Sequence, residues 1–368
     1  MKMAVDVSVL EFPLSGIARV VLGLYDACFR IDPTIEIAGV HQNSLQCALP
    51  ACFRDDRWGD WLHRRLWRRI ALPAYLRVKR PEVVHFPWNN GAVRSHKHCL
   101  TVLTIHDVIP LALPDMHFRN VKHRESYCRR MQNALDKSDL VLTDSEASKQ
   151  DISKYLNPHS EPAVVYPGLS FKETTLRDNQ MQKKEHGGYY IYQGGYHPRK
   201  GMQQLVPVFR DLYRQRQVAH PLVLVGKPNH DIAPGLGAQI EAGIKEGALI
   251  EKGYVSDEEL SHLMKGAIAL IYPSFYEGFG LPLLEAMSVG CPVVTTNVSS
   301  IPEVCGDAAV YFTPGDRDAL AKAIVLVEGD AQLQFDLQVR GFAQAKKFSW
   351  DTSAHVYLEL LANTRERT

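Results

Sequence analysis

The sequence predicts an α/β protein built from two doubly wound domains, each with a parallel sheet. Short apolar runs of strand length alternate with amphipathic runs of helix length, and this alternation is typical of a parallel sheet covered by helices. At 368 residues the chain is too long for one ordinary core, so two domains are expected. A polar, charged segment without periodicity at 171–188 separates two series of strand-like runs and predicts an interdomain linker.

Each series supplies the elements of one domain. The first predicts strands at 4–10, 82–86, 101–105 and 140–143, with helices at 18–29 and 119–135. The second predicts strands at 189–193, 221–225, 248–251, 267–272 and 292–295, with helices at 201–214, 257–265, 282–289 and 317–329. We therefore expect an N-terminal domain over 1–168 and a C-terminal domain over 169–349. Ligands of such sheets bind at the carboxyl ends of the strands.

Composition excludes several classes of protein. Apolar residues make up 45% and charged residues 23% of the chain, as in soluble globular proteins. The net charge of +1 gives no reason to expect a nucleic-acid partner. Seven cysteines, odd in number and without a CxxC pair, predict reduced thiols in the cytosol rather than disulfides or a metal site. The first ten residues predict a strand rather than a signal peptide, and no apolar run reaches the roughly 18 residues of a membrane span.

The most informative motif contains two glutamates eight positions apart. Glu277 precedes a glycine-rich turn with Gly278 and Gly280, and Glu285 lies within an apolar helical pattern. The start of that helix offers free backbone N–H groups and a positive dipole end, which suit an anionic ligand. The motif predicts a site for a charged, hydroxyl-rich molecule such as a nucleotide sugar.

A basic turn in the same half of the chain completes this picture. Arg199 and Lys200 follow a strand that ends in the pair Gly194-Gly195, and they precede a helix. The guanidinium fork and the compact ammonium group can together neutralise a pyrophosphate leaving group. The alternative, an ordinary solvated basic turn, is less favoured because the glutamate motif lies nearby in sequence.

Two motifs in the first half of the chain also lie at expected strand ends. A short loop ending in Ser15-Gly16 follows the first strand and opens a helix, a geometry suited to phosphate approach, although a turn is the simpler interpretation. His106-Asp107 ends a buried strand. A histidine there is commonly structural, but a strand end that faces a cleft favours function.

Two further segments look like helix starts. Ser145–Asp151 predicts a capped helix with a structural role. Ser256 and Glu259 predict a second cap, and Tyr254 and Val255 just before it could border a nucleobase.

The segment 54–80 departs from the neutral average. It holds nine basic residues against three acidic ones, a net charge of +6, and tryptophans interleave with the cations at partly helical spacing. An amphipathic helix of this kind suits an anionic membrane surface, whereas a solvated basic face packed on the domain is the alternative. Single-stranded nucleic acid is not favoured, because no RNA-binding motif accompanies the segment. The predicted membrane contacts are Trp58, Trp61, Arg64, Arg65, Trp67, Arg68 and Arg69.

These motifs, in this order and spacing, resemble the retaining glycosyltransferases of family 4, which have the two-domain GT-B fold. The resemblance covers nearly the whole chain and rests on the E-x7-E motif, the Pro-Arg199-Lys200-Gly turn, the His106-Asp107 strand end and the Gly16 loop. The ending from Phe348 to Leu361 also fits, and it implies that a last helix, 350–368, packs back on the first domain.

The resemblance implies a role for each motif. Arg199 and Lys200 would hold the diphosphate, and Glu285 would bind the ribose. Glu277 would position the donor sugar together with the backbone of Gly278, Phe279, Gly280 and Leu281. Gly16 would let its loop approach the diphosphate, and His106 would contact the sugar near the reacting carbon. Some members carry Arg at the position of Gly195, so this clamp has fewer cations or borrows Arg19.

The implied reaction transfers a hexose with retention and without a metal or other cofactor. The leaving phosphate would take the acceptor proton. Fixed cations and amide groups would stabilise the charge of the leaving group. Domain closure would exclude water from the donor.

Among donors, GDP-mannose is favoured. The acceptor would be a lipid-linked glycan of bacterial O-antigen or capsule assembly, at the inner face of the cytoplasmic membrane. A transferase that uses UDP-glucose or UDP-N-acetylglucosamine is the first alternative. A nucleotide-sugar epimerase and a non-catalytic nucleotide-sugar-binding protein are alternatives of another class.

Overall fold

The computed structural model describes residues 1–11, 16–59, 63, 66–89, 91–93, 98–169, 171 and 188–367. The chain forms two compact units. Unit 1 comprises Met1–Gly168 and Phe348–Thr368, and unit 2 comprises Leu169–Lys347. Most of the predicted linker, 172–187, lies outside the described residues.

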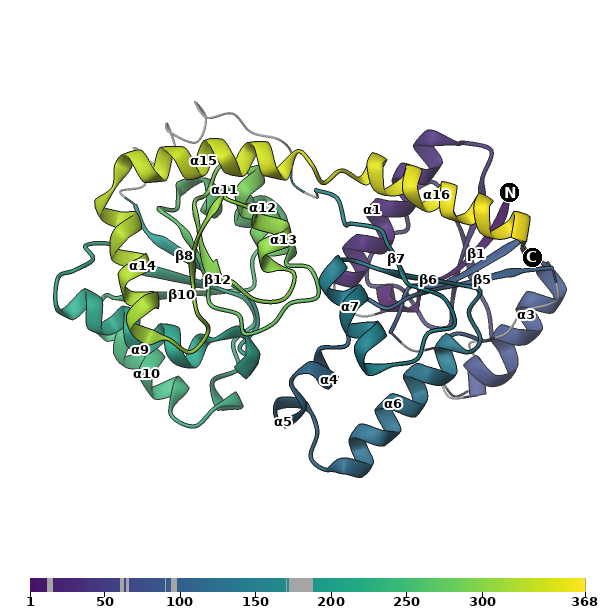
Figure 1. Ribbon diagram of the computed structural model, residues 1–368, viewed down its shortest axis with the longest axis horizontal. Helices are drawn as coiled ribbons and strands as arrows, with labels where there is room; N and C mark the ends of the chain where they lie inside the picture. The colour runs from purple at the N-terminus through teal and green to yellow at the C-terminus, as the bar shows by residue number, and fades with distance from the viewer. Residues whose placement is uncertain are drawn as a thin grey trace. The chain divides into compact units, whose positions relative to one another are not determined.

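Unit 1 is built on a parallel sheet whose strands are ordered β3-β2-β1-β4-β5-β6-β7 (Figure 1). The strands are β1 (Lys2–Asp6), β2 (Glu36–His41), β3 (Phe53–Arg57), β4 (Val83–Phe86), β5 (Leu100–Thr104), β6 (Leu140–Thr143) and β7 (Ala163–Val164). Its helices are η1 (Ser8–Glu11), α1 (Gly16–Ile31), η2 (Trp67–Ala71), α3 (Leu72–Lys79), α4 (Ile109–Ala112), α5 (Pro114–His117), α6 (Val121–Leu135), α7 (Glu146–Tyr155) and α16 (Trp350–Arg367).

Unit 2 repeats this plan with the strand order β10-β9-β8-β11-β12-β13. The strands are β8 (Tyr190–Gln193), β9 (Leu222–Val225), β10 (Leu249–Gly253), β11 (Leu270–Tyr272), β12 (Val293–Thr296) and β13 (Ala309–Phe312). Its helices are η3 (Pro198–Lys200), α9 (Met202–Arg214), η4 (His230–Ile232), α10 (Leu236–Lys245), α11 (Asp257–Gly266), α12 (Leu281–Ser288), α13 (Ile301–Cys305), α14 (Arg317–Gly329) and α15 (Ala331–Ala345).

Both sheets reverse their strand order beside the first strand of the unit. In unit 1 the reversal falls between β1 and β4, and in unit 2 between β8 and β11. Loops that leave the carboxyl ends of such a strand pair go to opposite faces of the sheet and open a crevice. The segments that follow β8 and β11 carry Arg199, Lys200 and Glu277, so the fold brings the predicted donor motifs to one place.

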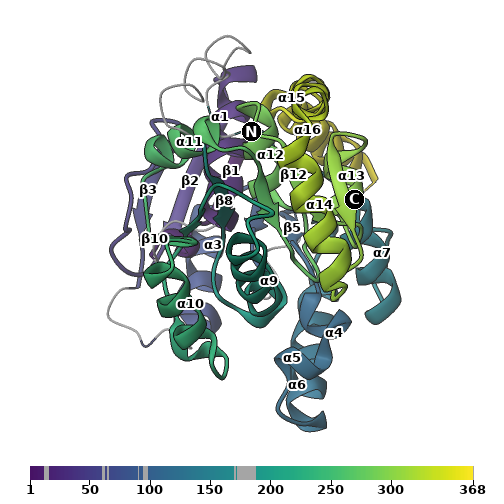
Figure 2. The same ribbon diagram turned by 90° about the vertical axis from the view of Figure 1, so that its left-hand side faces the viewer.

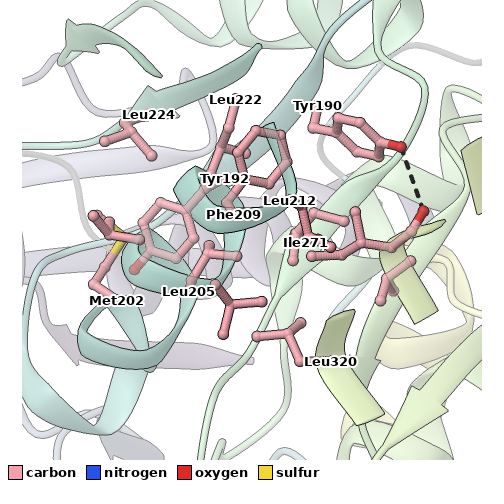
Figure 3. Packing of buried hydrophobic residues seen from close by; sticks show 14 of the residues in the cluster. Tyr190, Tyr192, Met202, Leu205, Phe209, Leu212, Leu222, Leu224, Ile271 and Leu320 are labelled. Carbon is pink, nitrogen blue, oxygen red and sulfur yellow. Dashed lines mark hydrogen bonds between the residues drawn. The ribbon is translucent and has the colours of Figure 1, made fainter. Parts of the chain in front are cut away.

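In the core of unit 2, the alternation of residues along a strand determines which side chains pack against the helices. The alternating residues Tyr190 and Tyr192 of β8 point to the same face of the sheet, where Phe209 and Leu205 of α9 cover them (Figure 3). Figure 3 also draws a hydrogen bond of the Tyr190 hydroxyl, which lies 3.4 Å from the carbonyl oxygen of Ile324 in α14. Helix α9 lies beside α10 and α14 on this face (Figure 2).

Helix α16 returns to unit 1 and lies along α1 (Figure 1). A buried polar cluster accompanies this packing: the Tyr25 hydroxyl lies 2.5 Å from Nδ1 of His85 in β4 and 3.1 Å from the Tyr357 hydroxyl of α16. Burial, with a smaller effect of His106, lowers the pKa of His85 to about 3, so this histidine is neutral at pH 7.

The structure differs from the sequence predictions at several elements. The first strand ends at Asp6, and a 3-10 helix, η1, takes over at Ser8 instead of the strand continuing to residue 10. Strands β2, β3, β7 and β13 and helices α4, α5, α10, α13 and α15 were not predicted. Strand β3 reads Phe-Arg-Asp-Asp-Arg, and it escapes a hydrophobicity pattern because it is an edge strand with exposed charges.

The prediction of an amphipathic helix in the segment 54–80 is wrong in two respects. The first residues of the segment form a strand, and some of the side chains predicted to contact a membrane are buried. Residues 53–57 are strand β3, and the helical part is η2 followed by α3. Trp67 is only 1% exposed, and its indole N–H donates to the carbonyl oxygen of Trp58. Trp58 in turn packs edge-on against Tyr75, with ring centroids 5.6 Å apart. Trp67 thus lies in the core of unit 1 and is not available to a membrane, whereas Trp58 is half-buried against that core.

Arg68 is also turned inward. Its guanidinium lies 3.7 Å from the Asp6 carboxylate and 5.9 Å from the centre of the Trp88 ring. Arg69 is exposed, whereas Trp61, Arg64 and Arg65 lie outside the described residues. Of the predicted membrane contacts that are described, only Arg69 therefore faces solvent fully.

The close contact of α1 with α16 makes Gly23 a test of how the C-terminal helix is held. A Cβ atom at Gly23 would lie 2.3 Å from the Trp350 ring, whereas one at Gly329, near the end of α14, would meet nothing within 4 Å. Alanine normally favours a helix over glycine by about 1 kcal/mol. We expect Gly23→Ala to lower the free energy of unfolding by roughly 1–3 kcal/mol because of overpacking, and Gly329→Ala to leave it unchanged or raise it. Urea unfolding measures both, and equal effects of the two variants would contradict the packing.

Candidate active site

The donor motifs of unit 2 meet in one ion cluster. Glu277 has a buried carboxylate, with 8% of its side chain exposed. Its Oε1 lies 2.7 Å from Nζ of Lys200, and its Oε2 lies 3.1 Å from a guanidinium nitrogen of Arg199. The structure therefore brings three of the predicted site residues into direct contact, with a summed formal charge of +1.

Two hydroxyl groups complete the shell of Glu277. The hydroxyls of Tyr272 and Ser274 lie 2.9 and 2.5 Å from Oε1. Burial alone would raise the pKa of Glu277, but Lys200, Arg199 and these hydrogen bonds outweigh it and lower the pKa to about 2. The carboxylate is thus ionised throughout the neutral range.

The backbone of the basic turn that follows β8 is held by the segment after β11, the neighbouring strand in the sheet. The carbonyl oxygen of Arg199 accepts from the N–H of Phe275 at 2.7 Å, just beyond β11. Gly201 has φ +76°, and a Cβ atom there would lie 2.0 Å from the carbonyl oxygen of Pro273. Only glycine fits this position, so the close approach of the two loops depends on it.

Gly195 behaves differently, because a Cβ atom there would meet nothing within 4 Å. Its carbonyl oxygen accepts from the Tyr192 hydroxyl at 2.8 Å, so the backbone is held while the side-chain position stays open. A larger residue is sterically possible where this chain has glycine.

Helix α12 carries the second glutamate. It begins at Leu281 after Gly280, which has φ +111° and serves as the N-cap. Ser300 donates to the carbonyl oxygens of Glu277 and Phe279, and the Ser299 hydroxyl accepts from the Glu277 N–H. The turn 277–280 is therefore tied to the loop after β12, and this directs the start of α12.

Glu285 is 2% exposed, and its Oε2 lies 3.3 Å from the side-chain amide nitrogen of Gln193. The amide oxygen of Gln193 is buried and has no hydrogen-bond partner among the described residues. A ligand hydroxyl could satisfy this oxygen. Sequence analysis did not select Gln193, although its place at the carboxyl end of β8 was a usable signal.

The remaining predicted donor contacts lie nearby in sequence but are less constrained. Tyr254 follows β10 and is 71% exposed, whereas Val255 is 9% exposed. The predicted cap is confirmed, because the Ser256 hydroxyl accepts from the Glu259 N–H at 3.1 Å. Gly16 is the first residue of α1, and the loop before it, 12–15, lies outside the described residues.

In unit 1, His106 follows β5 and is held from several directions. Its ring Nδ1 lies 2.7 Å from Asp144, and Nε2 lies 3.2 Å from the carbonyl oxygen of Pro87. Its backbone N–H donates to Asn89, and its carbonyl oxygen accepts from Ser148. Sequence analysis found His106 but missed Asp144, because only the fold brings β5 and β6 side by side.

The capped helix predicted at Ser145 is also confirmed. The Ser145 hydroxyl accepts from the Ser148 N–H at 3.0 Å, and α7 begins at Glu146. Ser148 has the additional contact to His106, so this segment does more than cap a helix.

No group of three or more His, Cys, Asp or Glu side chains in the described part of the chain is arranged to hold a metal ion. Within the same residues, no helix is both long and apolar enough to cross a membrane.

The sequence and the fold of this chain match those of known proteins. Residues 174–342 match the family described as Glycosyl transferases group 1, and residues 38–172 match Glycosyltransferase Family 4. The O-antigen chain mannosyltransferase B of Escherichia coli is 35% identical, over 95% of this chain and 97% of its own length. The chain belongs to the family 4 glycosyltransferases. It is an enzyme of this class.

Other relatives agree with this assignment. The O-antigen chain mannosyltransferase RfbU of Salmonella typhimurium is 29% identical, over 61% of this chain and 60% of its own length. Among solved structures, the glycosyltransferase WaaG, described as involved in lipopolysaccharide biosynthesis, has a TM-score of 0.76 at 15% identity and covers 98% of this chain and 99% of its own. Anabaena HepE, solved with UDP and glucose, has a TM-score of 0.71 at 19% identity over 98% of this chain and 99% of its own. These glycosyltransferase structures confirm the predicted GT-B fold.

The two glycines near the cations provide a matched pair of variants for this glycosyltransferase. We expect Gly201→Ala to push the basic turn away from Pro273, displace Lys200 and lower kcat/KM by about 100-fold, because displacements of about 1 Å have this effect. Gly195→Ala should retain activity within about threefold, since its position is open and its backbone conformation does not require glycine. Transfer assays on folded protein, checked by circular dichroism, measure both. Similar losses in the two variants would show that the contact with Pro273 is not what places the turn.

Proposed function

We propose that this glycosyltransferase is a retaining mannosyltransferase that moves mannose from GDP-mannose to a lipid-linked glycan during assembly of a bacterial surface polysaccharide. The observation that supports mannose most directly is the 35% identity to an O-antigen chain mannosyltransferase over nearly the full length of both chains. RfbU adds a second relative with the same sugar in its name.

The unit 2 site supports the chemistry of a nucleotide diphosphate sugar. Arg199 and Lys200 lie side by side and would bind the diphosphate, and the N-terminus of α12 would add its dipole. As the sugar–phosphate bond breaks, negative charge grows on the leaving phosphate, and fixed cations stabilise it more than they stabilise the ground state. The two cations would thus do what a metal ion does in other transferases, and the reaction would need no metal or other cofactor.

The contacts of Glu277 suggest how it supports this reaction. Its carboxylate binds both cations and holds them in place, so its contribution to the donor sugar would pass through the position of Arg199 and Lys200. Glu285 and Gln193 would accept hydrogen bonds from the ribose hydroxyls. The side-chain oxygen of Gln193 has no hydrogen-bond partner among the described residues.

A transferase that uses a UDP-sugar is the second candidate, because HepE has the same fold and was solved with UDP and glucose. We expect hydrolysis and transfer from GDP-mannose to exceed those from UDP-glucose and UDP-N-acetylglucosamine by at least tenfold. Excess EDTA should leave the rate of transfer unchanged.

Lys200→Ala should lower kcat/KM by about 100-fold or more, because it removes a charge that acts mainly in the transition state. Consumption of UDP-sugars alone would exclude the mannose proposal, and an unchanged Lys200→Ala rate would exclude the site.

We also propose that unit 1 contacts an anionic membrane, as a peripheral protein at the inner face of the cytoplasmic membrane. Around η2 and α3 the described side chains include exposed aliphatic groups at Leu66 (44%), Ile70 (54%) and Val78 (68%). Exposed cations lie among them at Arg69, Arg77, Lys79 and Arg80. Aliphatic groups that enter the headgroup layer beside cations that attract anionic lipid are typical of such contacts.

The membrane contact is tested with vesicles that contain about 30% phosphatidylglycerol. We expect the wild type to bind in a salt-sensitive manner and the double variant Arg69→Ser, Ile70→Ser to lose at least fivefold in affinity, since each cation near such a surface contributes about 1 kcal/mol. The control Lys322→Ser, Leu326→Ser removes one exposed cation and one exposed aliphatic group from α14 in unit 2. Equal loss in both variants, or none in either, would contradict a contact through this surface.

A further inference from the structure

The environment of His106 fixes the number of protons on its ring. Nδ1 faces a carboxylate oxygen of Asp144 at 2.7 Å, and Nε2 faces the carbonyl oxygen of Pro87 at 3.2 Å. Both partners are acceptors, so each nitrogen must carry a hydrogen for both bonds to form. A ring with two N–H groups is an imidazolium ion.

The positive charge of the His106 ring is buried, but it is paired with the Asp144 carboxylate. The side chains of His106 and Asp144 are 6% and 10% exposed, so the pair is shielded from water. An unpaired imidazolium there would be costly, whereas a carboxylate in direct contact offsets the loss of hydration. Burial alone would lower the pKa of His106, but the charge and hydrogen bond of Asp144 outweigh it and raise the pKa above its ordinary value.

The other groups around the ring favour the same state. Asp107 in the same loop adds a second negative charge, and Tyr127 of α6 lies near Asp107. His85 of β4 also interacts with His106, but its own pKa is lowered to about 3, so it is neutral and does not repel the imidazolium at pH 7. Thr104 binds the other nitrogen of His85 at 2.7 Å and keeps that ring in place.

We propose that Asp144 is a positioning residue that keeps His106 doubly protonated at neutral pH, so that Nε2–H is always available as a hydrogen-bond donor to a ligand oxygen at the carboxyl end of the unit 1 sheet. The bond from Nε2 to Pro87 is long for an N–H···O contact, whereas that from Nδ1 to Asp144 is short. The weaker bond is the one that a substrate oxygen would replace, while Asp144 holds the ring by the other nitrogen. The use of this N–H by a bound substrate rests on the proposed transferase function, whereas the charge of the pair does not.

The charge state is tested in the ligand-free protein by a nuclear magnetic resonance titration of ¹⁵N-labelled histidine, with His106 assigned by comparison with His106→Gln. We expect both ring nitrogens of His106 to be protonated at pH 7 in the wild type. Asp144→Asn should lower the titration midpoint by at least about 1 pH unit, because the loss of an adjacent opposite charge changes a pKa by about 1–3. Asp107→Asn removes a nearby carboxylate without breaking the short bond and should lower the midpoint less.

The role in the reaction is tested by pH profiles of kcat/KM for the same three proteins. Wild-type kcat/KM should fall about tenfold with each rise of 1 in pH above the midpoint of His106, because the neutral ring keeps its one proton on Nδ1 against Asp144. Asp107→Asn should fall in the same way from its slightly lower midpoint. In Asp144→Asn the fall should be weaker, because an amide can donate to Nδ1 and leave the proton on Nε2. A neutral His106 in the wild type at pH 7 would overturn the proposal without any variant. A wild-type pH profile that does not follow the midpoint of His106 would overturn the link to the ligand and leave the mannosyltransferase assignment standing. No transfer from any nucleotide sugar by the wild type would instead remove the proposed function.

Discussion

The contact of Glu277 with Arg199 and Lys200 is the constraint on which the unit 2 site depends. Two neighbouring cations at the end of a strand repel each other, and without a counter-charge their side chains would turn to solvent. A buried carboxylate with 8% exposure binds one cation with each oxygen and leaves a formal charge of +1. Because the carboxylate comes from the segment after β11 and the cations from the segment after β8, the contact joins the two strands at which the order of the sheet reverses.

Unit 1 has the same reversal but a different chemical content. Its order 3-2-1-4-5-6 matches that of unit 2, and the segments after β4, β5 and β6 meet at Pro87, His106 and Asp144. Here the buried charge pair contains a histidine, and its backbone is fixed by Asn89 and Ser148. The same topology thus supports two polar clusters of different charge, with two cations on one carboxylate in unit 2 and one histidine on one carboxylate in unit 1.

The elements predicted correctly are those whose bounds depend on the hydrophobic periodicity and the caps of their own segment. Strand 140–143 and helix 317–329 were predicted with their observed bounds, since hydrophobicity period and caps specify them within the segment. Strand β3 and the burial of Trp67 could not be predicted this way. An edge strand rich in charge has no apolar run, and the side of η2 that faces the sheet depends on Tyr75 and Trp58 rather than on spacing alone.

The candidate site shows the same division. Arg199, Lys200, Glu277, Glu285 and His106 were found because each lies in a short motif at a strand end. Their partners Tyr272 and Ser274 were not selected although they lie within five residues of Glu277, because neither belongs to the motif. Gln193 and Asp144 were missed because their contacts with Glu285 and His106 join segments 92 and 38 residues apart. Distances of that kind in sequence come only from strand order, which the motifs do not encode.

The ionisation of Glu277 limits the mechanisms that its two oxygens can support. With a pKa of about 2, the carboxyl group is almost never protonated near neutral pH, so it cannot act as a general acid. It is also a poor general base, because the best catalytic base has a pKa near the working pH, and four protein groups already bind its oxygens. What remains for Glu277 is to hold two cations where negative charge would develop. The catalytic contribution of the motif would then be electrostatic and would respond to the charge of the leaving group more than to the identity of the sugar. Discrimination between sugars would therefore depend on other contacts than the motif that identifies the family.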